Sequence, residues 1–102
     1  MKPGWCGWKE AKSRIIEALT SDNIAHEQRP DQMRKNLLFS GGVNVAFVGY
    51  LVGLTTGNMV TFEAHDLMPD VQVWILRPML QSEKWYLKCY IKSDVVFISV
   101  HR

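Results

Sequence analysis

The chain has 102 residues, of which 47% are apolar and 22% are charged, and its formal net charge is +2. This composition excludes an intrinsically disordered chain, and the small charge excludes a strongly basic protein that coats nucleic acid. The length predicts one domain, spanning residues 1–102. The two cysteines, Cys6 and Cys89, form no CxxC pair, so we expect neither a zinc site nor a disulfide framework.

The first half of the sequence predicts helices. Residues 8–23 have the spacing of an amphipathic helix. Its apolar face consists of Trp8, Ala11, Ile15, Ala18 and Leu19. Residues 23–28 predict a short strand, and residues 29–42 predict a second helix that a Gly-Gly pair ends. Residues 43–54 are almost continuously apolar, so the pattern leaves strand and helix open, while the length favours a helix.

The same apolar run, residues 43–54, is the longest in the chain. It is well short of the roughly 20 residues that a membrane-spanning helix needs. The first ten residues, MKPGWCGWKE, contain no apolar run of the kind found in a secretory signal. We therefore expect no membrane association and a cytoplasmic location.

The second half of the sequence predicts strands. They cover residues 58–65, 71–78, 84–91 and 95–102. A loop around Pro69 separates the first two. Helices followed by a run of strands are typical of the α+β class. We therefore expect an antiparallel sheet with the N-terminal helices packed on one face.

The last two strands predict a hairpin with a loop of two or four residues around Ser93 and Asp94. In the expected register Tyr86 lies opposite His101. One face then carries only apolar side chains, namely Leu87, Cys89, Ile91, Val96, Ile98 and Val100. The other carries Tyr86, Lys88, Tyr90, Phe97, Ser99 and His101. A slip by one residue mixes the two sets, so the pattern supports this register.

Several short landmarks of the second half recur with the spacing of a known family. They are Gly53-Leu54, Arg77-Pro78, Tyr86-Leu87-Lys88 and Asp94-Val95. In these landmarks the chain resembles the MqsR-type toxins of bacterial toxin–antitoxin pairs, which are relatives of the RelE-like ribonucleases. The resemblance implies a RelE/MqsR-like α+β domain that cleaves messenger RNA without a metal or cofactor. It also implies a cognate antitoxin as partner, and a helix over residues 43–54.

The family's active residues carry over in part. Its tyrosine falls on Tyr86, and a nearby lysine falls on Lys88. A C-terminal lysine of the family is replaced by His101, another lysine by Thr61, and a glutamine by Val73. The resemblance therefore implies the same face of the sheet, with different groups at three positions.

Cleavage of RNA by this route needs a base for the 2′-OH, an acid for the leaving 5′-oxygen and positive charge for the phosphorane. Imidazole titrates near neutrality, so His101 suits the acid or a charged phosphate contact. More distant RelE-like toxins pair a glutamate with a C-terminal histidine, which implies Glu63 as the base. Tyr86 and Arg77 complete the expected catalytic set, with Arg77 as a phosphate clamp.

Four further residues are predicted to bind substrate: Lys88, His65, Thr61 and Tyr90. Each candidate also has a plain structural interpretation. A histidine near a terminus can be a surface residue, and residues of an edge strand can simply be solvated. Arg77 can brace the chain before Pro78, and Tyr90 can pack across the strands. The rival hypothesis is a non-catalytic module of the same fold that binds RNA or protein.

Overall fold

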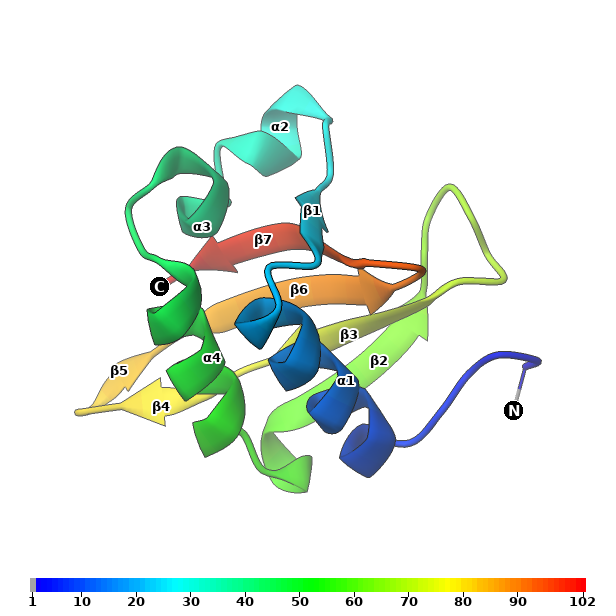
Figure 1. Ribbon diagram of the computed structural model, residues 1–102, viewed down its shortest axis with the longest axis horizontal. Coiled ribbons are helices and arrows are strands. Elements are labelled where there is room, and N and C mark those ends of the chain that lie inside the picture. Colours follow the sequence, from blue (N-terminus) through cyan, green and yellow to red (C-terminus); the bar gives the residue numbers. More distant parts are fainter. Residues whose placement is uncertain (1) are drawn as a thin grey trace.

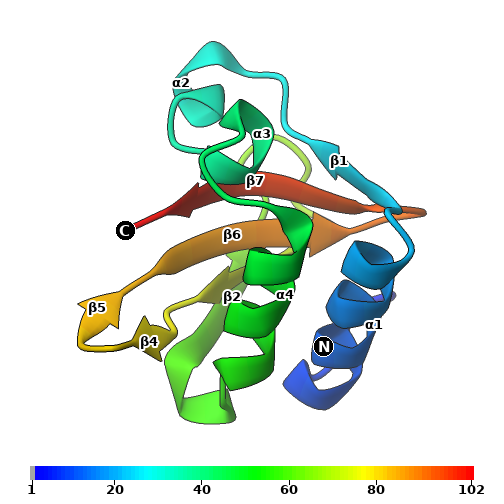
Figure 2. The same ribbon diagram turned by 60° about the vertical axis from the view of Figure 1, so that its left-hand side comes forward.

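The computed structural model describes residues 2–102, apart from the side chain of Gln32. Helices α1 and α4 lie side by side on one face of a five-stranded sheet (Figures 1 and 2). The elements are α1 Trp8–Thr20, β1 Ile24–His26, α2 Pro30–Met33, α3 Leu37–Ser40, α4 Val45–Leu54, a 3-10 turn Gly57–Met59, β2 Val60–Ala64, β3 Gln72–Leu76, β4 Met79–Leu80, β5 Glu83–Lys84, β6 Tyr86–Ile91 and β7 Val95–His101.

The expected α+β class is confirmed, but the sheet is mixed and not wholly antiparallel. Its strand order is β1-β7-β6-β3-β2. Strands β2, β3, β6 and β7 pair antiparallel, whereas β1 pairs parallel to β7 from Ile24 opposite Val95 to His26 opposite Phe97. The direction of β1 is set by the turn after α1, which delivers the chain alongside the start of β7.

The predicted helices at the start of the chain and over residues 43–54 are confirmed as α1 and α4. The single helix predicted over residues 29–42 is instead two short helices, α2 and α3. Asn36 causes the break, because its side-chain oxygen accepts a hydrogen bond from the backbone N–H of Phe39 at 3.0 Å and caps α3. The Asn36 amide also bonds to His26 Nδ1 at 2.9 Å, which ties the break to β1.

A small hairpin, β4–β5, was not expected from the sequence. It projects from the end of β3 and joins it to β6 (Figure 1). Gln81 and Ser82 both adopt left-handed backbone angles, with φ of 51° and 69°. Two consecutive left-handed residues are what the tightest hairpin turns require, although Gly and Asn are the usual residues there. Neither residue type signals such a turn.

The C-terminal hairpin follows the predicted register only in its outer half. Tyr86 lies opposite His101, and Lys88 lies opposite Ser99. A β-bulge then shifts the pairing, so that Cys89 faces Phe97 and Ile98 is the extra residue. The loop between Ile91 and Val95 has three residues, whereas a loop of two or four residues was expected.

The bulge corrects the predicted faces of β7. An extra residue reverses the in–out alternation for the part of the strand that precedes it. Phe97, expected on the polar face, is therefore fully buried in the main core under the helices. Ile98, expected there, instead packs with Val73 and Tyr90 in a second cluster on the opposite face.

A largely buried carboxylate anchors that second cluster. Glu27 lies just after β1, and its Oε2 accepts a hydrogen bond from the Tyr90 hydroxyl at 3.0 Å. Its Oε1 lies 3.0 Å from Arg29 Nε and 3.4 Å from His65 Nε2, as electrostatic contacts without hydrogen-bond geometry. Arg29 extends the network through a hydrogen bond of 3.1 Å from Nη1 to Asp66 Oδ2. The chain between β1 and α2 is thereby held across this end of the sheet.

We predict that Tyr90→Phe lowers the free energy of unfolding by about 1–3 kcal/mol at pH 7, because a buried carboxylate loses its hydroxyl donor. Burial, together with the hydrogen bond to Glu27, raises the pKa of Tyr90 to about 12 from its ordinary value of 10.0. A raised pKa means that this contribution is complete below pH 10 and is lost as the pH rises through 12. The difference between wild type and variant should therefore shrink over that window in urea titrations.

Tyr50→Phe is the matched control, because Tyr50 is 56% exposed on α4. It should change the free energy of unfolding by less than about 0.5 kcal/mol, both at pH 7 and between pH 10 and pH 12. A Tyr90→Phe difference that stayed constant from pH 9 to pH 12 would contradict the assigned role of the phenol.

Candidate functional site

The face of the sheet opposite α1 and α4, called the open face from here on, presents side chains in three rows across the strands. The first row consists of Arg77, Tyr86 and His101. The second row consists of Thr61, Ile75, Lys88 and Ser99. The third row consists of Glu63, Val73, Tyr90 and Val96. Arg77 and His101 are therefore direct neighbours of Tyr86, whereas Glu63, the fourth predicted catalytic residue, lies two rows away.

The first row is a stack of three planar groups. The rings of Tyr86 and His101 are stacked, with centroids 5.0 Å apart and planes at 20°. The Arg77 guanidinium carbon lies 5.5 Å from the centroid of the Tyr86 ring. Arg77 directly follows β3 and His101 ends β7, the two strands that flank β6, so they approach Tyr86 from opposite sides. The half-buried Tyr86 ring is thus flanked by a planar group on either side.

Two hydrogen bonds orient the outer members of this stack. Arg77 Nη1 donates to the Thr61 hydroxyl at 3.3 Å. His101 Nδ1 lies 2.8 Å from the backbone carbonyl oxygen of Arg102. A carbonyl oxygen only accepts, so Nδ1 carries the N–H, and Nε2 is the ring atom free to exchange a proton with a ligand. The row therefore offers a guanidinium, a phenol hydroxyl and an imidazole nitrogen within a short span.

The second and third rows are linked by a loose ion pair. Lys88 Nζ lies 4.0 Å from Glu63 Oε2, beyond hydrogen-bond distance. Glu63 stands on the edge strand β2, and Lys88 reaches toward it from β6 across β3. Among the described residues, Lys88 is the cation that pairs with Glu63. Lys88 is close to the first row, because it is two residues from Tyr86 on the same strand.

The structure does not bring the predicted base and acid together. Glu63 lies on β2 and His101 on β7, which are separated by β3 and β6. Neighbouring strands are about 4.8 Å apart, so the two backbones are about 14 Å apart across the sheet and a further two rows apart along it. Glu63 and His101 cannot act on one phosphate from these positions.

Two predicted substrate-binding residues are buried. Tyr90 is 6% exposed and His65 is 3% exposed, and both belong to the network around Glu27. His65 Nδ1 accepts hydrogen bonds from the backbone N–H groups of Leu67 and Met68, at 3.0 and 3.2 Å. Both side chains thus hold the β2–β3 loop and the chain after β1, and neither is accessible to a substrate.

Three residues near these rows were missed by sequence reasoning. Glu27 and Arg29 lie in a short polar segment whose composition gives no sign of a network. Arg102 places its guanidinium 4.7 Å from the centroid of the Trp85 ring, and its Nε bonds to Glu83 at 3.0 Å. These contacts depend on segments far apart in the sequence, so no local pattern could reveal them.

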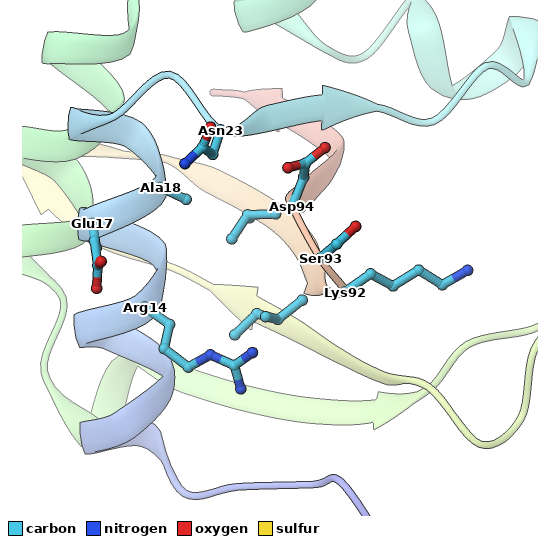
Figure 3. A pocket seen from close by; sticks show the side chains of 9 residues that line it. Arg14, Glu17, Ala18, Asn23, Lys92, Ser93 and Asp94 are labelled. Carbon is cyan, nitrogen blue, oxygen red and sulfur yellow. The ribbon is translucent and has the colours of Figure 1, made fainter.

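A polar pocket of about 180 Å³ lies elsewhere, between α1 and the β6–β7 loop (Figure 3). The charged groups of the side chains that line this pocket do not point toward one another. The guanidinium of Arg14, the ammonium of Lys92 and the carboxylate of Asp94 point in different directions (Figure 3). This pocket lacks the shared focus that a catalytic or anion-binding site needs, so the first row remains the better candidate.

Within residues 2–102, no three His, Cys, Asp or Glu side chains are grouped so that they could hold a metal ion. None of the helices described in this part of the chain has the length and apolar content to cross a membrane.

Comparison of the sequence with protein-family models gives no match. Comparison with curated proteins likewise identifies no relative.

Proposed function

We propose that the chain is an endoribonuclease, an mRNA interferase toxin of a type II toxin–antitoxin pair. The observation that carries the proposal is the contact of Arg77, Tyr86 and His101 in one accessible row of the sheet. These three groups are the kinds that handle a phosphodiester without a metal. The resemblance to MqsR-type toxins at Tyr86-Leu87-Lys88 points to the same face.

In the proposed mechanism the 2′-OH of the RNA gives up its proton to solvent water, its oxygen attacks the adjacent phosphorus, and the bond to the 5′-oxygen breaks. His101 delivers a proton from Nε2 to the leaving oxygen, while its Nδ1–H stays bonded to the Arg102 carbonyl. Arg77 balances the charge that builds on the phosphorane oxygens, and the Tyr86 hydroxyl donates to one of them. Dependence on the 2′-OH makes the reaction specific for RNA.

The second candidate function is a non-catalytic module that binds RNA or protein through the same face. One specific observation favours it. Within the described residues, the first row holds one imidazole and no carboxylate, because Glu63 is three strands away and pairs with Lys88. Such a row can bind a phosphate while lacking a separate base for the nucleophile.

We propose messenger RNA as the substrate and a cognate antitoxin as the protein partner, with action in the cytoplasm where both are found. The side of the sheet covered by α1 and α4 (Figure 2) is left to the partner, since the first row lies on the open face. Neutralisation by direct binding would then not require the antitoxin to imitate RNA.

We predict that His101→Ala lowers the rate of RNA cleavage by about 10²–10⁴-fold, as expected for loss of a general acid. His101→Lys separates proton transfer from charge. A lysine has an unperturbed pKa of about 10.4, so it restores charge but is a poor acid near pH 7. Single-turnover cleavage of a labelled transcript measures both variants. Lys9→Ala on α1, far from the row, is the control and should cut at the wild-type rate.

If His101→Lys keeps most of the activity, the imidazole acts by charge alone. If His101→Ala is fully active, His101 has no part in the reaction. A urea titration of each variant checks that the fold is intact, with an expected loss of about 0.5–1.5 kcal/mol from the broken ring stack.

We predict that Arg77→Ala lowers the cleavage rate by about 10²–10³-fold, the usual effect of removing a group that stabilises transition-state charge. Arg77→Lys should recover part of this, because lysine keeps the charge but loses the planar fork and the contact with the Tyr86 ring. Thr61→Val is the control for a structural role, since it removes only the hydroxyl that Arg77 contacts. Equal losses in Thr61→Val and Arg77→Ala would mean that Arg77 merely braces the sheet.

We predict that regulated expression of the chain arrests bacterial growth and shortens cellular transcripts, whereas expression of the His101→Ala variant does neither. Growth curves and transcript-end mapping measure the two effects. Unimpaired growth at high protein level, with RNA still cleaved by the purified chain, would refute the toxin role and leave the nuclease.

A further inference from the structure

A second, smaller pocket lies on the open face beside the third row, with a volume of about 170 Å³. Its floor is apolar, formed in part by Val73 and Ile98, each 1% exposed. Ile98 is the bulged residue of β7, so the floor exists because the bulge turns this side chain to the open face. Charged side chains rise around the floor.

The four charged groups of the wall form two pairs, of which one is hydrogen-bonded and the other is not. Arg29 is engaged with Asp66 through a hydrogen bond of 3.1 Å, and its Nε also lies 3.0 Å from Glu27 Oε1. Lys88 and Glu63 face each other at 4.0 Å, too far for a hydrogen bond. Their ammonium and carboxylate therefore keep their capacity to donate and accept, and both reach a ligand seated on the floor.

The charges that line the pocket wall indicate which class of ligand fits it. Two cations, Arg29 and Lys88, are balanced by two anions, Glu63 and Asp66, so the wall has no net charge. A phosphate would meet two carboxylates, and a metal ion would meet two cations. An uncharged planar ring with donors and acceptors on its edge suits both the apolar floor and the Lys88–Glu63 pair.

The position of the pocket relative to the first row narrows the ligand further. Lys88 is one row from Tyr86, and two residues of a strand span about 6.7 Å. A nucleotide whose phosphate lies on the first row can therefore place a neighbouring base in the pocket. Tyr86 itself already contacts Arg77 and His101 with its ring, which favours a base contact elsewhere.

We propose that this pocket binds an unpaired nucleobase of the RNA next to the cleaved phosphate, with Glu63 accepting from a base N–H and Lys88 donating to a base acceptor. The assignment to a substrate rests on the proposed ribonuclease function, whereas the ability to bind a base does not. Glu63 and Lys88 are then specificity residues, and the first row performs the chemistry.

Binding is tested with the full-length chain and the four ribonucleosides, which carry no phosphate. Their effect on backbone amide NMR signals is followed at millimolar concentrations, with ribose and inorganic phosphate as comparison probes. At least one nucleoside should shift the signals of Ala64, Val73 and Lys88. Ribose should not, and inorganic phosphate should shift those of Arg77 and His101 instead.

Glu63→Gln and Lys88→Met should each weaken nucleoside binding by at least about fivefold, because each removes one hydrogen bond to the base edge. Lys9→Met, on α1, should leave it unchanged. The base-pocket proposal is overturned if no nucleoside binds, if ribose alone gives the same shifts, or if both wall variants bind like the wild type.

A cleavage assay separates this proposal from the proposed function. On a pool of RNAs that differ in the bases around the cut, Glu63→Gln should alter which bases are preferred while cleavage continues. Nucleoside binding without any RNA cleavage would refute the nuclease and leave a base-binding pocket. Cleavage with an unaltered base preference in Glu63→Gln would refute the pocket as a specificity site and leave the nuclease.

Discussion

The extra residue in β7 is the constraint on which the rest of the structure depends. With Ile98 unpaired, Phe97 turns into the main core beneath the helices, and Ile98 turns to the open face. Beyond the bulge, the outer half of the strand keeps the alternation that puts His101 beside Tyr86. The bulge therefore divides the open face into an accessible polar end and a partly covered end with an apolar floor.

Sheet geometry then decides which groups can act together. Residues in one row on adjacent strands come within about 5 Å, whereas residues three strands apart cannot meet on one small ligand. This is why Arg77, Tyr86 and His101 form one candidate centre, and why Glu63 does not join it. Glu63 instead lies at the wall of the second pocket with Lys88. In the proposed ribonuclease, phosphate chemistry therefore lies on one row and base contact on the next two.

The network around Glu27 gives the covered end its rigidity. One carboxylate accepts from Tyr90 and faces Arg29 and His65, and it thereby joins β6, the β2–β3 loop and the chain after β1. Such a buried polar group is stable only when its partners are present, because an unpaired carboxylate out of water is costly. Tyr90 and His65, which were expected to contact the substrate, instead contact Glu27 within this network. Their polarity serves the fold, which residue type alone could not show.

The sequence by itself determined what local periodicity encodes. Spacing of apolar residues predicted α1, length favoured a helix for α4, and alternation predicted the main strands and the pairing of Tyr86 with His101. Only the tertiary structure decided the bulge at Ile98, the parallel pairing of β1, the break at Asn36 and the distance between Glu63 and His101. The reason is physical: apart from the local cap at Asn36, each of these depends on contacts between segments far apart in the chain, which shift a register or satisfy a polar group in ways that no short pattern records.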